Sequence, residues 1–261
     1  MPDFAQLSST RRSFLGAAAA GAGAAILPGI SRAQEPAGRR VDAIAFDGFV
    51  IFDPRPVNAM VKAAFPEHGD ALAQAWSAKL FGYSWLYTAA GQYTPFAEIA
   101  DGALRFAAET LGLSLTGAVR ARLVESYAQL NAWPDVKPAL ARLRAAGVRL
   151  AFLSNLSEPT LRANMDRAGI SAEFDHILST DRVRQFKPSP AAYGMAPAAF
   201  ALPKSRIGFA AFGGWDAAGA AWYGYRTAWI NRFGVVSEKI EPGPAIAGPG
   251  MDAVLMLAGL A

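Results

Sequence analysis

The chain of 261 residues contains no cysteine, and this absence excludes several kinds of chemistry. Without thiols there is no disulfide framework, no cysteine nucleophile and no thiolate metal site. The absence of cysteine does not identify the redox compartment, and an oxidising compartment is compatible with this sequence. Hydrophobic residues make up 52% of the chain, which is enough for a full-sized core in one large domain or two smaller ones.

The net charge of the chain is also small. Charged residues are 18% of the chain and the net charge is +4; residues 1–33 carry three arginines and one aspartate, so the remainder has a net charge of +2. The basic residues are scattered rather than aligned along one helix, which leaves no electrostatic footprint for nucleic acid. We therefore expect a small-molecule partner and no nucleic acid.

The apolar run near the start of the chain is too short to span a bilayer of about 30 Å comfortably. The pair Arg11–Arg12 precedes this Ala/Gly-rich run, which ends at Leu27, and Ser31–Ala33 places small residues where a signal peptidase cuts. The pattern resembles a twin-arginine export signal rather than a transmembrane anchor or a disordered tail. We expect a signal peptide at residues 1–33, no membrane span after its cleavage, and a mature protein that is periplasmic or secreted.

The segment Val41–Asp53 organises the rest of the chain. Its β-forming residues 44–46 stop at Asp47, as a buried parallel strand does where it reaches the edge of a sheet. In an open α/β sheet that edge binds ligands, so Asp47 is a candidate nucleophile, base or metal ligand. An aspartate that only caps a loop is the structural alternative. Pro54 and Pro56 end the strand.

Helical patterns and no strand pattern follow, and we assign residues 55–133 to an inserted helical cap domain. A bundle inserted directly after a catalytic strand would lie over the site as a lid. Most of its aromatic residues are expected to fill the bundle, and one or two to face Asp47; they are Trp76, Phe81, Tyr83, Trp85 and Phe96. The expected helices are Val57–Phe65, Gly69–Tyr87, Phe96–Leu111 and Thr116–Ala132.

Strands and helices alternate from residue 134 onwards, which predicts an α/β fold with a doubly wound parallel sheet. Its core domain comprises residues 41–54 and 134–261. The expected helices are Val136–Ala146, Glu158–Ala168 and Pro190–Phe200. The expected strands are Val148–Leu153, Ile177–Leu178, Arg206–Ala211 and Thr227–Ile230, with one more edge strand at Ala253–Leu257.

Four strand ends carry reactive side chains: Asp47, Ser154 with Asn155, Lys187 and Asp216. Because the carboxyl ends of parallel strands meet at one edge of a sheet, a hydroxyl, a cation and two carboxylates should converge there. Four independent loop residues explain this pattern poorly. We interpret the set as an active site.

A set of motifs runs through about residues 41–233: Ala45-Phe46-Asp47, residues 76–86, Leu153-Ser154-Asn155, Phe186-Lys187-Pro188 with Tyr193, Trp215-Asp216-Ala217 with Gly219, and Trp229-Ile230-Asn231-Arg232. Together they resemble the haloacid dehalogenase superfamily, and in detail its type II branch, the (S)-2-haloacid dehalogenases. Phosphatases of the superfamily carry a second aspartate two residues after the nucleophile, where this chain has Phe49, which neither donates a proton nor ligates a hard cation. We therefore expect no cofactor and no metal.

The resemblance implies a role for each matched polar residue. Asp47 attacks the carbon that bears the leaving group and forms an ester, while Lys187 keeps this carboxylate ionised and oriented. Ser154 and Asn155 help to bind the substrate carboxylate or hold the nucleophile. Asp216 orients and activates the water that hydrolyses the ester.

The resemblance also implies a small 2-haloacid as substrate and a homodimer joined through the caps. Tyr193 is expected to support the lysine from beside the substrate. The apolar pocket around the substrate is expected to be formed by Phe49, Phe81, Phe96 and Trp215.

The chain departs from the family where the halide and the water are held. Its nucleophile loop is one residue shorter and lacks the family's threonine. Ser77 stands in place of the cap arginine that receives the halide, and Ala211 and Gly213 stand in place of a serine and an asparagine. Each donor lost from a preorganised site typically raises the barrier by about 2.7 to 4 kcal/mol.

Three functions stay open. The first is a hydrolase that converts a 2-haloacid to a 2-hydroxyacid, with Lys79, Arg55 or an ordered water in place of the missing arginine. The second is the same covalent chemistry on a non-halogenated substrate whose leaving group needs no halide cradle. The third is an exported, non-catalytic binding protein. The intact Asp47, Lys187 and Asp216 favour an enzyme.

Overall fold

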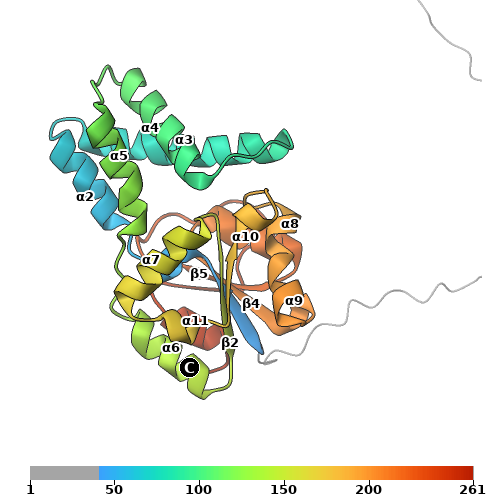
Figure 1. Cartoon of the computed structure of the whole chain (residues 1–261). Coiled ribbons are helices and arrows are strands. Elements are labelled where there is room, and N and C mark those ends of the chain that lie inside the picture. Colours follow the sequence, from blue (N-terminus) through green and yellow to red (C-terminus); the bar gives the residue numbers. More distant parts are fainter. Residues whose placement is uncertain (1–40, 261) are drawn as a thin grey trace, which may run out of the picture. The chain divides into compact units, whose positions relative to one another are not determined.

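The computed structural model describes residues 41–260, so the expected export signal at residues 1–33 lies outside the described residues. A six-stranded sheet, parallel throughout, has the strand order β3-β2-β1-β4-β5-β6 (Figure 1). The expected doubly wound parallel sheet is confirmed. Its strands are β1 (Ala43–Phe46), β2 (Arg149–Ser154), β3 (His176–Ser179), β4 (Ile207–Ala211), β5 (Arg226–Ile230) and β6 (Ile246–Gly248).

The alternation of side chains along β1 divides the core into two layers. Ile44 and Phe46 belong to the layer that contains α6 (Val136–Ala145), α7 (Glu158–Ala168) and α11 (Asp252–Leu257). Ala43 and Ala45 belong to the layer that contains α8 (Pro190–Tyr193), α9 (Met195–Phe200) and α10 (Gly214–Tyr223). All four side chains of β1 are fully buried, so the strand that ends at Asp47 is fixed by packing on both faces.

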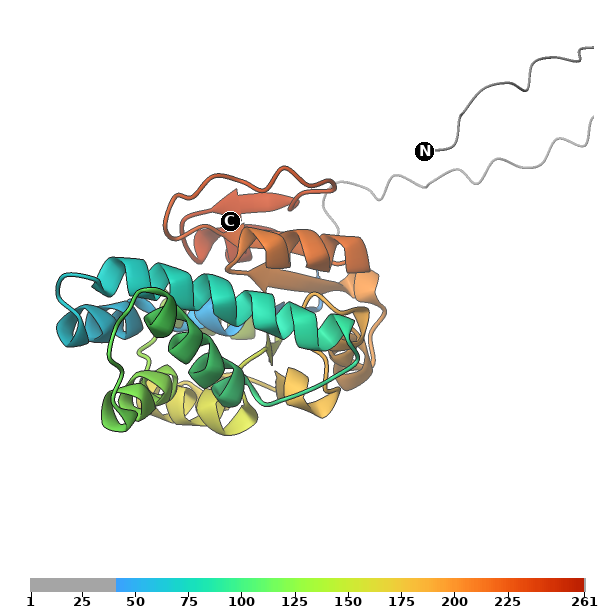
Figure 2. The same ribbon diagram turned by 90° about the horizontal axis from the view of Figure 1, so that it is seen from above.

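The cap is formed by α2 (Arg55–Ala64), α3 (Gly69–Ala89), α4 (Phe96–Thr110) and α5 (Gly117–Glu125), with a 3₁₀ turn at Ser126–Ala128. The buried indole of Trp76 joins α3 to α4, because its Nε1 donates to the carbonyl of Ala100 at 2.7 Å. The chain leaves the core for the cap after Phe52 and returns to the core near Ala132. These two residues form an antiparallel bridge, so the two connecting segments are adjacent. Figures 1 and 2 show the cap lying across one end of the sheet.

Three expectations for local structure were wrong. Residues 48–51 form a helical turn, α1 (Gly48–Ile51), rather than a continuation of the strand, because the Asp47 carboxylate caps it. Ala253–Leu257 belongs to α11 instead of an edge strand, and the edge is occupied by β6; a short apolar run does not distinguish the two by periodicity. The helix expected at Pro190–Phe200 is divided at Gly194 into α8 and α9.

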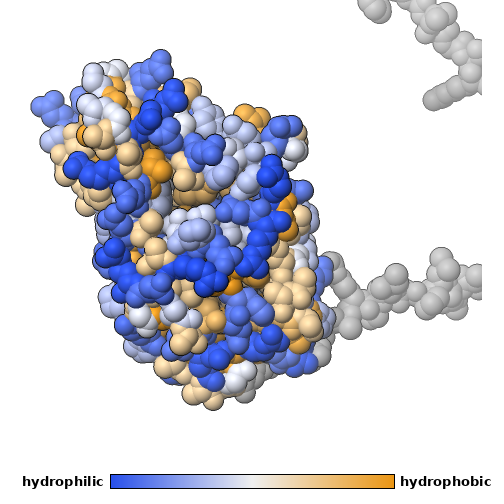
Figure 3. All heavy atoms as spheres, in the orientation of Figure 1, coloured by the Kyte–Doolittle hydropathy of each residue, from blue (hydrophilic) through white to orange (hydrophobic). Residues whose placement is uncertain are grey.

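Polar and charged residues are spread over the face of the core that Figure 3 shows, with apolar residues among them in small groups. Within residues 41–260, the structure contains no helix with both the length and the apolar character needed to cross a bilayer. The remaining 3₁₀ turns lie at Ser171–Glu173, Thr180–Arg182 and Lys204–Arg206.

Candidate active site

The expected convergence of side chains at the carboxyl edge of the sheet is present in the structure. Asp47 follows β1, Ser154 ends β2, Lys187 follows β3 and its 3₁₀ turn, and Asp216 lies in the first turn of α10 after β4. The Lys187 ammonium joins two of them, because Nζ donates to Asp47 Oδ1 at 2.8 Å and to Asp216 Oδ2 at 2.6 Å. The three charged groups therefore form one connected unit.

Lys187 is completely enclosed, with 1% of its side chain exposed. Burial by itself lowers the pKa of a lysine, but the negative charges of Asp216 and Asp47 outweigh this effect and hold the pKa of Lys187 above its usual value. The ammonium is thus charged throughout the neutral range. It neutralises part of the negative charge that the two carboxylates bring to the site.

The surroundings of Asp216 change the pKa of its carboxyl. Burial raises its pKa to about 6, while the Lys187 charge opposes the rise and the Asp47 charge adds to it. The hydroxyl of Tyr193 donates to Asp216 Oδ1 at 2.7 Å. Asp216 is therefore ionised at neutral pH yet close enough to titration to exchange a proton.

Asp47 is held from two sides and open on a third. Its Oδ2 accepts a hydrogen bond from the backbone N–H of Phe49 at 3.0 Å, as the cap of helical turn α1. Its Oδ1 accepts from Lys187, and the residue also lines the cavity between core and cap. A fixed, partly exposed carboxylate at the wall of a cavity has the geometry of a nucleophile.

Ser154 and Asn155 hold the loops around this unit. The Ser154 hydroxyl accepts from the N–H of Leu156 at 3.1 Å, and Asn155 Oδ1 accepts from the backbone N–H of Lys187 at 3.0 Å. Both residues also line the cavity. Gly48 is required here, since a Cβ at that position would lie 2.9 Å from the Ser154 hydroxyl oxygen.

The cavity between cap and core has a volume of about 690 Å³ and a mainly apolar wall. Phe49, Phe81, Phe96 and Trp215, the four expected aromatic residues, all line it. Phe81 meets Trp215 edge to face with ring centroids 5.3 Å apart. Other lining residues were not predicted from the sequence, for example Tyr127 at the end of the cap and Phe212 directly after β4. The position of Phe212 after a strand is the signal that could have identified it.

Tyr193 does not occupy the place expected for it. Its side chain is fully buried and is not part of the cavity wall. Its hydroxyl donates to Asp216 and not to the lysine. Gly219 makes this approach possible, because a Cβ at residue 219 would lie 2.7 Å from the Tyr193 hydroxyl oxygen. Tyr193 therefore orients the second carboxylate from behind.

None of the described residues that line the cavity is a lysine or an arginine. The two cations expected to take the place of a cap arginine point elsewhere: Arg55 forms an ion pair with Asp53 at 2.6 Å, and the Lys79 ammonium lies 3.6 Å from the ring centroid of Phe106. At Gly213, where the resemblance led us to expect an asparagine in other members, a Cβ would lie 2.7 Å from Trp215 Nε1. The indole occupies the space that a larger side chain would need.

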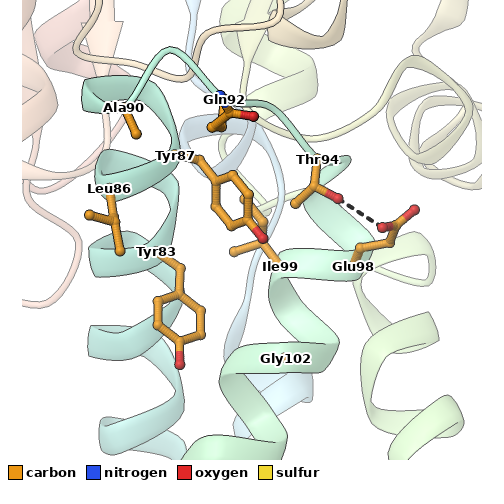
Figure 4. Close-up of a pocket in the computed structure, with 9 residues that line it drawn as sticks. All are labelled: Tyr83, Leu86, Tyr87, Ala90, Gln92, Thr94, Glu98, Ile99 and Gly102. Atoms are coloured by element: carbon orange, nitrogen blue, oxygen red, sulfur yellow. Dashed lines mark hydrogen bonds between the residues drawn. The ribbon is translucent and has the colours of Figure 1, made fainter.

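A second hollow, of about 510 Å³, lies between α3 and α4 (Figure 4). The hydrogen bond drawn in this figure runs from the Thr94 hydroxyl to the Glu98 carboxylate, with an oxygen–oxygen distance of 2.8 Å. This hollow does not contain the reactive unit. The lining residues are Tyr83, Leu86, Tyr87, Ala90, Gln92, Thr94, Glu98, Ile99 and Gly102.

No set of three or more His, Asp or Glu side chains within residues 41–260 is arranged to hold a metal ion. The position two residues after Asp47 is held by Phe49, which has no ligand atom in its side chain.

Comparison with known proteins gives one consistent family. Residues 41–224 match the model of haloacid dehalogenase-like hydrolases. The chain is 34% identical to haloacetate dehalogenase H-2 of Moraxella sp. (strain B), over 84% of this chain and 98% of the relative. It is 35% identical to the (S)-2-haloacid dehalogenase of Pseudomonas sp. (strain YL), over 83% and 94%.

Solved structures agree. A crystal structure of an L-2-haloacid dehalogenase superimposes with a TM-score of 0.82 at 38% identity, covering 85% of this chain and all of the other. The Xanthobacter autotrophicus enzyme with chloropropionic acid covalently bound superimposes with a TM-score of 0.75 at 26% identity, covering 83% and 98%.

Proposed function

Because the chain belongs to the haloacid dehalogenase-like hydrolases, we propose that it hydrolyses the carbon–halogen bond of a small (S)-2-haloacid through a covalent ester on Asp47. The product is the 2-hydroxyacid. Relatives named as (S)-2-haloacid dehalogenases match this chain over 94% of their length, and one named as a haloacetate dehalogenase matches over 98%. The observation that carries the proposal is the enclosed Lys187, which joins Asp47 at the cavity wall to Asp216.

In the first half of the reaction, a carboxylate oxygen of Asp47 attacks carbon 2 of the substrate and the halide departs with the bonding electron pair. Lys187 and the Phe49 N–H each hold one oxygen of Asp47, so the nucleophile is oriented before the substrate arrives. Ser154 and Asn155 bind the substrate carboxylate in this proposal, which their position at the same cavity wall supports. The substituent on carbon 2 lies among the aromatic side chains.

In the second half, water attacks the ester carbonyl carbon, which releases the 2-hydroxyacid and restores the Asp47 carboxylate. Asp216 accepts the proton of that water, because it is ionised at neutral pH and its pKa of about 6 suits a general base. Tyr193 holds Asp216 in place. The net change consumes one water and releases one halide and one proton.

The absence of lysine and arginine from the described cavity wall supports a second candidate, in which the same ester forms from a non-halogenated substrate whose leaving group needs no cation. If the substrate is a haloacid, water and the edges of the aromatic rings must receive the departing halide. A purely structural or binding role is disfavoured, since a buried ion pair contributes little net stability compared with apolar packing.

The test is halide release by the purified protein from (S)- and (R)-2-halopropionates and haloacetates. We expect release from the (S) isomer and none in Asp47→Asn, whose folding is checked by circular dichroism. An Asp47→Asn protein that releases halide at the wild-type rate contradicts the covalent mechanism. A folded wild-type protein that releases none from any member contradicts the dehalogenase assignment and leaves the second candidate.

We also propose that residues 1–33 are a twin-arginine export signal and that the mature protein is periplasmic or secreted. The match to the family model begins at residue 41, which supports a separate role for the residues before it. Replacement of Arg11 and Arg12 by lysine should keep the full-length protein in the cytoplasm, as fractionation and mass spectrometry of the N-terminus would detect. Efficient export of that variant contradicts the proposal.

A further inference from the structure

The turn between α3 and α4 contacts the core segment that leads to Lys187. Tyr93, in this turn, donates a hydrogen bond from its hydroxyl to Asp181 of the core. Its ring stacks on Phe186 with centroids 5.4 Å apart and an interplanar angle of 25°. The Arg184 guanidinium lies over the same ring, 4.8 Å from its centroid. One cap side chain thus contacts three residues of the segment 180–187.

A second cap residue holds the backbone of that segment. The N–H of Phe186 donates to the hydroxyl of Thr88 at 3.1 Å, and the hydroxyl in turn donates to the carbonyl of Ser84 at 2.9 Å. The next N–H, that of Lys187, donates to Asn155 at 3.0 Å. Two consecutive backbone groups are therefore fixed, one by the cap and the other by the core.

The conformation of the segment indicates that outside contacts hold it. Arg184 has a φ of 52°, in the left-handed region that a residue with a Cβ adopts at a cost in free energy. Such a conformation persists where the surrounding contacts determine it. Here the outside contact is that of the Arg184 side chain, which lies over the ring of Tyr93 from the cap; the N–H of Arg184 bonds within the segment, to the Asp181 carbonyl at 3.3 Å.

We propose that Tyr93 and Thr88 are positioning residues that latch the far end of the cap onto residues 180–187 and thereby place the Lys187 ammonium between Asp47 and Asp216. In Figures 1 and 2 the end of α3 that carries this latch lies over α8, away from the segments that connect α2 and α5 to the sheet. Closure of the cap and assembly of the charged unit are then a single event. The kinetic part of this inference rests on the proposed function.

The physical reason is the enclosure of Lys187. Its ammonium reaches both carboxylates at 2.8 and 2.6 Å from a backbone that Asn155 fixes at one N–H. A shift of residue 186 moves the start of the lysine side chain, which disturbs the lengths and angles of the two short contacts. A displacement of about 1 Å at a reacting group typically lowers the rate by about 10²-fold.

Two substitutions of Tyr93 separate its contacts. Tyr93→Phe keeps the ring over Phe186 and removes the bond to Asp181, whereas Tyr93→Ala removes both. We expect kcat for 2-chloropropionate to fall about tenfold in Tyr93→Phe, the value of one charge-assisted hydrogen bond, and about a hundredfold in Tyr93→Ala. KM should change little, because the substrate contacts lie elsewhere.

The pH profile separates positioning from a general loss of structure. The Lys187 charge holds down the pKa of Asp216, which stands at about 6. When Lys187 is displaced, this pKa rises, so the acidic limb of kcat should move to higher pH in Tyr93→Ala. The groups that face Asp216 are Lys187, Asp47 and Tyr193, and Tyr93→Ala substitutes none of them, so the shift reports the displacement of Lys187.

Hydrogen–deuterium exchange tests the latch without any turnover. Exchange of residues 180–187 should be faster in Tyr93→Ala than in the wild type. The matched controls are Tyr87→Ala and Tyr87→Phe, because Tyr87 is on the last turns of α3 and lines the hollow between α3 and α4 instead (Figure 4). Both controls should retain the wild-type exchange and kcat.

Equal exchange of residues 180–187 in Tyr93→Ala and Tyr87→Ala overturns the proposal, whether or not the protein turns over a haloacid. Faster exchange with an unchanged kcat and pH profile also overturns it, since the latch would not then place Lys187. If Tyr93→Ala fails to fold, Tyr93→Phe decides by the same measurements. If the wild type releases no halide, the proposed function fails while the exchange comparison still judges the latch.

Discussion

Replacing Lys187 with methionine should destabilise the protein strongly, and by an amount that depends on pH. The methionine has a similar length and no charge, so it leaves the buried Asp47 and Asp216 facing one another without the ammonium that now contacts them at 2.8 and 2.6 Å. Removing one partner of a buried ion pair typically costs about 3–5 kcal/mol. We expect a loss in that range at pH 8.

The pH dependence follows from the Asp216 carboxyl, whose pKa burial raises to about 6 even with the Lys187 charge lowering it. Without Lys187 that pKa rises further. A carboxyl whose pKa is raised in the folded state lowers the stability progressively as the pH rises from its unfolded pKa of about 3.8 to the raised value, and the loss is complete above that value. The loss in Lys187→Met should therefore be clearly smaller at pH 5 than at pH 8.

The assay is urea denaturation of both proteins at the two pH values, followed by tryptophan fluorescence. Lys62→Met is the matched control, since Lys62 pairs with Asp70 at 2.7 Å with 54% and 85% of the side chains exposed, and a surface pair contributes at most about 1 kcal/mol. A loss below about 1 kcal/mol in Lys187→Met, or the same loss at both pH values, refutes the reasoning.

Three further predictions concern activity. Because Asp216 must be ionised to accept a proton, kcat should fall as the pH drops below about 6 and be level above it; a flat profile measured from about pH 4.5 to 8.5 contradicts this role. Ser77→Arg brings a cation to an exposed position at the cavity wall. It should raise kcat/KM for 2-chloropropionate roughly tenfold, which is part of the 10²–10³-fold change in kcat that one preorganised donor supplies. No gain over Ser77→Gln would argue that the halide leaves elsewhere. Treatment with a chelator should leave halide release unchanged, and inhibition that magnesium reverses would favour phosphatase-type chemistry.

The sequence is informative about the carboxyl edge of the sheet because strand ends have a strong local signal. At Asp47 and Ser154 an apolar run stops at a polar residue, and the structure brings these residues together with Lys187 and Asp216 as expected. Parallel pairing itself forces this convergence. The α/β architecture and the inserted cap were therefore predictable without knowledge of any contact.

Contacts between cap and core have no such local signal. Tyr127 joins the cavity wall because the 3₁₀ turn Ser126–Ala128 that follows α5 brings its ring against Phe49, with centroids 6.2 Å apart. Tyr93 meets Asp181 across 88 positions of sequence. Both pairings depend on how two packed bodies meet, which the period of one segment does not encode. The contact of Tyr193 lies within the core, between α8 and α10, and has no local signal either: the resemblance placed this residue beside the substrate, whereas its hydroxyl donates to Asp216.

The central claim, an ester on Asp47, is tested most directly by a single turnover in H₂¹⁸O with the protein in excess over (S)-2-chloropropionate. Attack by Asp47 carries an unlabelled carboxylate oxygen into the first lactate formed, and the water that hydrolyses the ester leaves ¹⁸O in the carboxylate. Mass spectrometry should find ¹⁸O in the peptide that contains Asp47 and none in the lactate hydroxyl. Label in the lactate with an unlabelled Asp47 peptide would show direct attack by water and contradict the account.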